Sequence, residues 1–427
     1  MIKLYNNPKE YFENRPTEVP GSGNRLTETV EDILADVKVR GDAALRDYAA
    51  RFDGVTSADY SLEVTRGEID AAVSAVEPDF LRILERAAEN IRDFHSHQTR
   101  TGFITQDKSG VIMGQKVLPV ARAGVYIPGG TAAYPSSALM NIIPAKIAGV
   151  PEIVMITPPG TDGGIKNKFI IAAAAVAGVD RIFKTGGAQG IAALAFGTQT
   201  IPRADKITGP GNAFVAEAKR QVYGICGIDM MAGPSDITII ADGSANPRFL
   251  AADMLAQSEH DVLASAILIT TSGAVAQGTI DEIERQLAEL PRREIAEKSV
   301  NERGAVILVQ DLAEAIKTAN EIAPEHLEIC TQSPFDLLPD VKNAGSVFLG
   351  QYTPEALGDY FSGANHTLPT LGTARFASPV SVDDFVKKTQ FTYYTEDALR
   401  AVAADIDSFA KKEGLDGHGK SVTERFS

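Results

Sequence analysis

The chain has 427 residues, of which 44% are hydrophobic and 23% are charged, a composition that excludes disordered and fibrous proteins and is typical of a globular one. At this length a single hydrophobic core stops growing, so we expect two or more domains. The net charge of -15 argues against nucleic acid or an anionic membrane surface as a partner. We therefore expect small molecules or proteins as partners.

The first thirty residues are polar and lack the apolar segment of an export signal, so we expect a cytoplasmic location. The longest apolar run, residues 169–179, is far shorter than the roughly 20 residues that span a bilayer, and it predicts a core helix. The chain has only two cysteines, Cys226 and Cys330, which are too few for a disulfide framework. We expect both to pack in the core as small apolar side chains.

The N-terminal part predicts an arm followed by helices. Two prolines and a glycine-rich stretch interrupt regular structure, so we expect residues 1–22 to form an arm. Apolar residues then recur at helical spacing over residues 30–37, and Gly41 is expected to end that helix. A second long helix is expected over residues 78–97, and alternation over residues 102–120 predicts paired strands.

From residue 152 onward, short β-branched runs alternate with apolar helices, which is the pattern of α/β domains with parallel sheets. The expected strands are residues 153–157, 181–184, 236–241, 266–271, 305–309 and 346–349. The expected helices include residues 168–177, 191–196, 214–223 and 248–260.

These elements predict an α/β fold with two Rossmann-like lobes and mostly parallel sheets. Chain order suggests that residues 121–235 form one lobe, inserted within another made of residues 23–120 and 236–380. Residues 381–427 are charged and carry little apolar surface for a core of their own. We expect this segment to be a helical tail that packs against another part of the assembly.

Three glycine-rich turns follow predicted strands, at the positions where open α/β sheets bind ligands. They span residues 124–130, 185–190 and 208–212. None has the G-x-G-x-x-G pattern with an acidic residue about 20 positions on, so dinucleotide binding is not established by the pattern. Two alternatives stay open: ordinary tight turns with Asn212 as a helix N-cap, or a site for a phosphate or amide group.

Histidine is scarce, with 6 residues in 427, and four of the six lie in the second half of the chain, in segments that also carry acidic residues. In one of these segments Glu325 and His326 are adjacent, so they can supply two proton-transfer groups to one reacting centre. Any one histidine alone is better explained as a surface or helix-end residue. The coincidence of four favours a functional site.

A metal site is the sharper form of this hypothesis. In the helix predicted over residues 248–260, Gln257 and His260 are three positions apart and so share a face. Adding Asp359 and His418 gives an amide, two imidazoles and a carboxylate, a ligand set without thiolate that suits Zn²⁺, or Mn²⁺ in its place. Such ligands come from distant segments, so the ion would assemble at a junction between elements.

A series of ordered motifs runs along the chain: residues 40–45, 51–55, 126–137, 186–189, 209–212, 232–235, 257–261, 323–329, 354–360, 365–370 and 413–418. With these motifs the chain resembles the histidinol dehydrogenase family over essentially its whole length. Two positions depart from the commonest family pattern. Gly190 follows Gln189 where alanine is usual, and Asp236 follows Ser235 where glutamate is usual.

The resemblance implies a four-electron oxidation of L-histidinol to L-histidine through histidinaldehyde, the last steps of histidine biosynthesis, with NAD as acceptor. It implies catalytic roles for Glu325 and His326. The implied zinc ligands, one ion per subunit, are Gln257, His260, Asp359 and His418. The implied NAD contacts are Tyr126, Gln189 and Asn212. The implied substrate contacts are Ser235, Gln257, His260, His326, Asp359, Glu413 and His418, with His366 as a neighbour.

The resemblance also implies a homodimer in which the C-terminal tail of one subunit reaches the active site of the other, with Glu413 and His418 acting there. Three alternatives stay open. An NAD-dependent dehydrogenase of another small alcohol, such as a hydroxy sulfonate, would share the scaffold. A zinc hydrolase would use the Glu325–His326 pair without NAD. A metal-stabilised binding protein would leave that adjacency unexplained.

Overall fold

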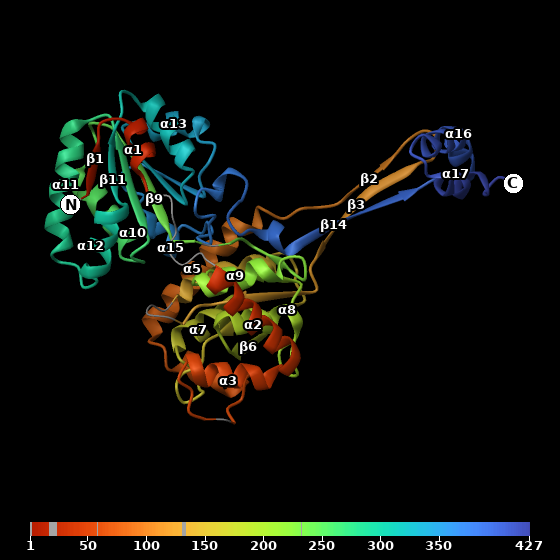
Figure 1. Cartoon of the computed structure of the whole chain (residues 1–427), viewed down its shortest axis with the longest axis horizontal. Helices are drawn as coiled ribbons and strands as arrows, with labels where there is room; N and C mark the ends of the chain where they lie inside the picture. Colours follow the sequence, from red (N-terminus) through yellow and green to blue (C-terminus); the bar gives the residue numbers. More distant parts are fainter. Residues whose placement is uncertain (1, 17–23, 58, 130–133, 232) are drawn as a thin grey trace. The chain divides into compact units, whose positions relative to one another are not determined.

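A computed structural model describes residues 2–16, 24–57, 59–129, 134–231 and 233–427 of the chain (Figure 1). Part of the predicted N-terminal arm, residues 17–22, and the motif residues 130–133 and 232 lie outside these ranges. The chain divides into two compact units: residues 1–98 with 120–385, and residues 99–119 with 386–427. No helix in the described ranges is long and apolar enough to cross a membrane.

The first unit contains a parallel five-stranded sheet in the order β6–β5–β4–β7–β8. Its strands are β4 (Arg122–Tyr126), β5 (Glu152–Thr157), β6 (Arg181–Lys184), β7 (Lys206–Thr208) and β8 (Gly227–Ile228). The helices beside it are α2 (Asn24–Arg40), α3 (Asp42–Phe52), α4 (Arg66–Ser74), α5 (Pro78–Ser96), α6 (Pro135–Ile147), α7 (Lys168–Ala177), α8 (Gly187–Phe196) and α9 (Ala213–Val222).

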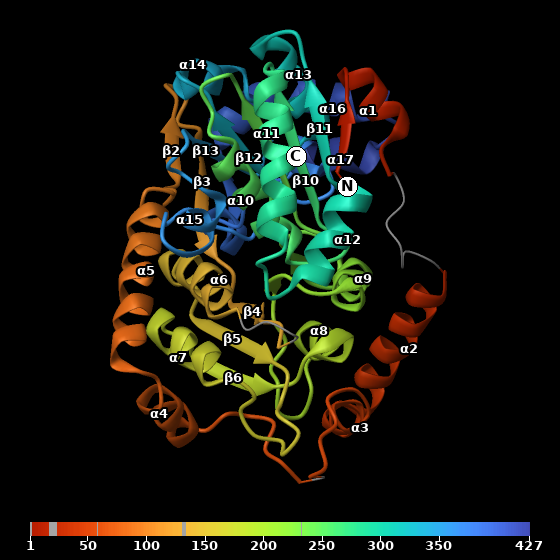
Figure 2. The ribbon, with the colours of Figure 1, turned by 90° about the vertical axis from the view of Figure 1, so that its left-hand side faces the viewer.

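Both faces of this sheet are covered because successive strand side chains point to opposite sides. On β5, Ile153 and Met155 pack with α6 and α7, whereas Val154 and Ile156 pack with α2, α3, α8 and α9. Figure 2 shows α6 and α7 on one side of the sheet and α8 on the other. This double burial explains why the strands are almost continuously apolar in sequence.

A parallel six-stranded sheet, in the order β1–β11–β10–β9–β12–β13, forms the rest of the first unit's α/β core. Its strands are β1 (Lys3–Tyr5), β9 (Asp236–Ala241), β10 (Ser265–Thr270), β11 (Ala305–Leu308), β12 (His326–Cys330) and β13 (Ser346–Leu349). One face packs on α10 (Pro247–Ser258), α11 (Gly273–Leu287) and α12 (Arg293–Arg303), and the other on α1 (Pro8–Asn14) and α13 (Leu312–Ile322). Short helices α14 (Pro334–Leu337) and α15 (Glu355–Tyr360) follow β12 and β13.

The predicted α/β fold with two mostly parallel sheets is confirmed. Three strands have the predicted bounds, at residues 181–184, 236–241 and 346–349. Two others differ by one residue at one end, and β10 is shifted by one residue at both ends. The helix predicted to reach His260 ends at Ser258, so that bound was wrong. Both cysteines are buried, as expected for core residues.

The second unit joins a three-stranded antiparallel sheet to two helices that pack against each other. Its elements are β2 (Phe103–Gln106), β3 (Ile112–Pro119), β14 (Val386–Tyr393), α16 (Glu396–Lys412) and α17 (Asp416–Thr423). The tail predicted as helical therefore also contains a strand, β14, because its residues pair with β3 along the whole length of both strands.

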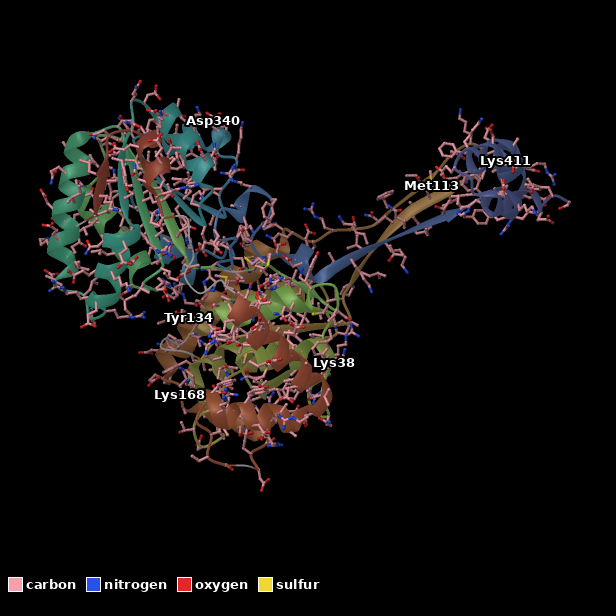
Figure 3. All side chains as sticks on the ribbon, viewed as in Figure 1. Lys38, Met113, Tyr134, Lys168, Asp340 and Lys411 are labelled. Atoms are coloured by element: carbon pink, nitrogen blue, oxygen red, sulfur yellow. The ribbon has the colours of Figure 1, made fainter. Side chains whose placement is uncertain are left out.

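Among the described residues of this unit, the only buried hydrophobic side chains are Val111, Ala398 and Ala410. Apolar side chains are instead exposed, including Ile104 at 71% and Phe409 at 68%. Met113, labelled on β3 in Figure 3, is 48% exposed. The unit thus carries apolar surface that its own fold does not cover.

Candidate active site

The site begins where two neighbouring strands of the six-stranded sheet start. Helix α13 ends at Ile322 and is capped by Ala323, whose φ of 55° is left-handed, and the chain then turns through Pro324 into β12. This places Glu325 beside Asp236, the first residue of β9. The Glu325 N–H donates to Asp236 Oδ1 at 3.0 Å, and the Asp236 N–H donates to Glu325 Oε2 at 3.0 Å. The reciprocal bonds fix the Glu325 carboxyl in the plane of the strand ends.

Glu325 is a carboxyl group held in a poorly solvated place. It is 5% exposed, and burial raises its pKa well above the ordinary value, with the Asp236 carboxyl adding to the effect. Burial likewise raises the pKa of Asp236 to about 7. A carboxylate whose pKa is raised is a stronger base than an ordinary glutamate, so Glu325 suits proton transfer.

His326, the first residue of β12, presents an unprotonated nitrogen to the site. Its Nδ1 lies 3.0 Å from the backbone oxygen of Asp236, and since that oxygen can only accept, Nδ1 donates. In the neutral ring Nε2 then carries the lone pair. Burial lowers the His326 pKa to about 4, although the Asp359 carboxylate opposes the shift. The imidazole is therefore neutral near pH 7 and can accept a proton.

Helix α15 supplies two carboxyl groups to His326. Glu355 and Asp359 are four residues apart and so share a face. Glu355 Oε1 lies 3.6 Å from His326 Nε2, and ligand atoms of His326, Glu355 and Asp359 all lie within 4.8 Å of one another. Burial, with the charges of Asp359 and Asp253, raises the Glu355 pKa to about 8. This cluster has the composition of a cation site.

Glu355 was not among the residues predicted for the site. The signal was present in the sequence, because Glu355 precedes Asp359 by one helical turn in the segment 354–360. Its own burial, with 3% exposed, is visible only in the structure.

Asp359 is tied to His366 and through it to the other lobe. His366 Nδ1 lies 3.2 Å from Asp359 Oδ1 and 3.1 Å from its backbone oxygen, while Nε2 lies 3.2 Å from Ser137 Oγ on α6. Burial alone would raise the Asp359 pKa, but the hydrogen bond and charge of His366 outweigh it and lower the pKa. Asp359 is thus held as a carboxylate, the form that binds cations.

Gln257 has a buried amide without a partner. It lies in the last turn of α10 and is 1% exposed, and neither Oε1 nor Nε2 has a hydrogen-bond partner among the described residues. An unsatisfied buried amide costs roughly 1–3 kcal/mol, so such groups usually have a partner. A bound cation would accept the Oε1 lone pair, so this residue fits a metal site.

His260 lies two residues beyond the end of α10, not on the helix face shared with Gln257 that the sequence predicted. The helix ends because Glu259 closes it as the C-cap, and the His260 N–H still reaches the Gln257 carbonyl at 3.3 Å. The charge of His260 lowers the pKa of both His326 and Asp359, so His260 lies within electrostatic range of both. Gln257 and His260 are thus linked to each other by a backbone hydrogen bond, and His260 lies within electrostatic range of Asp359.

The predicted NAD contacts lie at the carboxyl ends of the five-stranded sheet. Tyr126 ends β4, Gln189 lies in the first turn of α8 after β6, and Asn212 follows β7. The Tyr126 hydroxyl accepts a hydrogen bond from the Gly187 N–H. Gly209 packs so closely on Tyr126 that a Cβ there would lie 2.0 Å from the Tyr126 carbonyl oxygen. Tyr126 thus touches both glycine-rich turns that carry the other two residues.

Asn212 is a helix N-cap, one of the two alternatives that the sequence left open. Its Oδ1 accepts from the Phe214 N–H at 3.1 Å and the Val215 N–H at 3.2 Å. The side-chain Nδ2 has no part in the cap, so capping and ligand contact are compatible.

Three further residues were predicted to contact the substrate. Ser235 immediately precedes β9 and is half-buried, with its carbonyl accepting the Ser265 N–H at 3.1 Å. Glu413 ends α16 and His418 lies in α17, and both are exposed. Glu413 and His418 both belong to the second unit.

The chain is similar to known proteins over almost its whole length. The family model described as histidinol dehydrogenase matches residues 19–426. A histidinol dehydrogenase of Clostridium acetobutylicum is 51% identical over 418 residues, 98% of this chain and 96% of that protein. One of Listeria monocytogenes serotype 4b is 53% identical over 397 residues, 93% of this chain and 92% of its own. A crystal structure of histidinol dehydrogenase from Elizabethkingia anophelis has a TM-score of 0.92 at 38% identity, covering 99% of this chain and 98% of that one.

Proposed function

The chain belongs to the histidinol dehydrogenase family, and from this premise we propose that it oxidises L-histidinol to L-histidine through histidinaldehyde, with two NAD as acceptors. The observation that carries the proposal is the cluster of His326, Glu355 and Asp359, whose ligand atoms all lie within 4.8 Å of one another, with the buried Glu325 carboxyl next to His326 in the chain. It combines two proton-transfer groups with side chains that can hold a cation. In total, histidinol, one water and two NAD⁺ give histidine, two NADH and three protons.

His326 is the proposed base of the alcohol step. Its Nε2 carries a lone pair because Nδ1 donates to the Asp236 carbonyl. Nε2 takes the hydroxyl proton of L-histidinol while the carbinol C–H leaves as hydride, which yields the aldehyde. Glu355 Oε1 lies 3.6 Å from Nε2, so this carboxyl group is next to the imidazolium that forms.

Glu325 is the proposed base of the aldehyde step. The Glu325 carboxylate takes a proton from water, the water oxygen adds to the aldehyde carbon, and the resulting diol loses a second hydride to give the carboxylate. Its hydrogen bond from the Asp236 N–H fixes one oxygen and leaves the other for the water. Burial around the pair keeps bulk solvent from the aldehyde.

The residues of the site fit a divalent cation, and we propose one zinc ion per subunit, with manganese as a substitute. The proposed ligands are Gln257, His260, Asp359 and His418. The buried amide of Gln257, without a partner among described residues, supports this choice. When bound, zinc supplies a Lewis acid that orients the imidazole and amino group of the substrate. Substrate contacts are proposed for the same four residues and for Ser235, His326 and Glu413.

NAD binding is proposed at the carboxyl ends of β4, β6 and β7, where parallel sheets place ligands. The proposed contacts are Tyr126, Gln189 and Asn212. The close packing of Gly209 on the Tyr126 backbone, where a Cβ would lie 2.0 Å from the carbonyl oxygen, brings the turn after β7 against the end of β4. When bound, NAD supplies the hydride acceptor for both steps.

We propose that the chain works as a homodimer in which Glu413 and His418 complete the site of the partner subunit. The second unit supports this, because it buries few apolar side chains and exposes many, as an interface segment does before assembly. Ile104 and Phe409 are examples on its sheet and on α16. The predicted split of the first unit into two lobes with bounds at residues 120 and 235 is likewise kept as a proposal.

The proposal is tested by adding NAD and L-histidinol to the purified chain and following NADH. The expected result is two NADH formed for each L-histidinol consumed, with L-histidine as product. A His326→Asn variant is the matched control, because it keeps the fold while removing the base. Hydrolysis of an ester or amide without NADH, or NADH from a hydroxy sulfonate but not from L-histidinol, would contradict the proposal.

A further inference from the structure

The first unit also contains an ionic pair whose two side chains are almost completely buried. Lys219 on α9 contacts Asp229, which follows β8, and their side chains are 1% and 0% exposed. Taking two charges out of water is expensive, and an apolar pair of the same size is often at least as stable. The presence of so deeply buried an ion pair is therefore not explained by its contribution to stability.

Both side chains also form hydrogen bonds with the backbone of one residue, Gly209. The Gly209 N–H donates to Asp229 Oδ2 at 2.8 Å, and the Gly209 carbonyl accepts from Lys219 Nζ at 3.0 Å. Asp229 Oδ1 also accepts from the Met230 N–H at 2.6 Å. Both polar groups of one residue are thus tied to the two partners of one ion pair.

Gly209 is the residue whose position decides the shape of the turn after β7. Its φ of 117° is a conformation that residues with a side chain rarely adopt, and a Cβ there would meet the Tyr126 carbonyl oxygen at 2.0 Å. Three residues later the turn ends at Asn212, which caps the same helix that carries Lys219. The Lys219–Asp229 ion pair, the turn of residues 209–212 and the Asn212 N-cap are therefore all connected to one another, through Gly209 and through α9.

We propose that Lys219 and Asp229 are positioning residues for the dinucleotide, holding the turn of residues 209–212 so that Tyr126 and Asn212 keep a fixed separation. The inference rests on the proposed binding of NAD at this turn. It predicts that loss of the pair weakens NAD binding selectively. The Glu325–His326 pair lies at the start of β12 in the other sheet, and these bonds do not connect it to the ion pair.

The test uses the full zinc-loaded enzyme with Lys219→Met, and a double variant with Lys219→Met and Asp229→Leu. The double variant removes both charges together, so it leaves no unpaired buried carboxylate and keeps the fold. In either variant the KM for NAD should rise at least about tenfold, while the KM for L-histidinol and the zinc content change by less than about twofold. NADH binding, followed by its fluorescence, should weaken in parallel.

Lys206→Met is the matched control. Lys206 begins β7, at the end of the strand opposite the turn, and its Nζ pairs with Asp384 Oδ1 at 3.1 Å. Its KM for NAD should stay within about twofold of the unmodified enzyme. A folded double variant with an unchanged KM for NAD would overturn the inference. Equal loss of NAD, histidinol and zinc binding would overturn it too, because it would show a general structural role. Absence of NADH formation by the unmodified enzyme would instead refute the proposed function on which it rests.

Discussion

Glu325 and Asp236 each donate a backbone N–H to the carboxyl group of the other, across the start of two neighbouring parallel strands. Neither carboxyl can rotate away without breaking a bond to the backbone of the adjacent strand. Asp236 is also the residue whose carbonyl oxygen orients His326. Asp236 thus sets the positions of both proposed proton-transfer groups. Its side chain and N–H bind Glu325, and its carbonyl oxygen binds His326.

Glu325→Gln should slow the oxidation of histidinaldehyde by about 10²- to 10⁴-fold, because an amide cannot take a proton from water. The amide oxygen still accepts the Asp236 N–H, so the fold should be kept. Stopped-flow measurement of NADH from added histidinaldehyde gives the rate. Oxidation of the aldehyde at the unmodified rate would remove Glu325 from this role.

Gln257→Leu should lower the affinity for zinc by roughly 10- to 100-fold while raising the stability of the metal-free chain by about 1–3 kcal/mol. Both effects have one cause, because the buried amide is without a partner among the described residues until a ligand binds it. Zinc titration and urea unfolding after chelation measure the two quantities.

Gln221→Leu is the control for that substitution, because the Gln221 amide already donates to the Thr27 carbonyl at 3.0 Å. It should lower stability and leave the affinity for zinc unchanged. Chelation should abolish activity of the unmodified enzyme, and zinc or manganese should restore it. A Gln257→Leu variant that binds zinc normally would exclude this residue as a ligand.

Mixed dimers of Glu325→Ala and His418→Ala subunits should regain activity that neither variant has alone. If His418 acts in the partner subunit, then one of the two sites in a mixed dimer contains both an intact Glu325 and an intact His418. About a quarter of the unmodified activity is expected after random exchange of equal amounts, since half of the dimers are mixed and each has one working site. Mass spectrometry of the intact dimer verifies the exchange. Proven exchange without recovered activity would place His418 in its own subunit's site.

The stability of the metal-free chain should fall as the pH drops from about 6.5 toward about 4, because of His326. Burial lowers the folded-state pKa to about 4 from an ordinary 6.5, so only the unfolded chain binds the proton in this window. Stability is therefore fully present above pH 6.5 and is lost on acidification, by up to about 3 kcal/mol.

A His326→Asn variant cannot titrate and should lack this part of the loss. Urea unfolding of both proteins at a pH of about 5 and about 7.5 isolates the histidine from other groups, since these titrate in both proteins. The same change in stability with pH in both would contradict the pKa assigned to His326.

Most of the strands could be predicted from the sequence, but the strand that carries the active site could not. Strands β6, β9 and β13 are short apolar runs bounded by turns, which is the pattern of a parallel strand buried on both faces. Strand β12 is only five residues long and has ionisable residues, His326 and Glu328, at two of its positions, so it does not show the continuous apolar run of the other buried parallel strands. Its charged residues are buried because the site and the neighbouring helices supply partners, and that information is not local to the strand.

Residue identity could be predicted better than geometry. The adjacency of Glu325 and His326 pointed to the reacting centre, whereas the contribution of Glu355 depends on burial and on the 3.6 Å approach to His326. The buried pair of Lys219 and Asp229 gave no sequence signal, because ten residues separate them and their meeting depends on the path of β8. Contacts between elements, not within them, are what the sequence pattern does not contain.

Strand β1 ends the six-stranded sheet with only three residues, Lys3–Tyr5, paired to β11. If β11 were the edge strand, its unpaired backbone groups could pair with strands of other molecules. As the edge strand, β1 has only three residues and therefore few unpaired backbone groups for such pairing. A fusion partner or deletion that disturbs these residues would uncover β11 and favour aggregation. Affinity tags on this protein are therefore better separated from β1 by a flexible spacer.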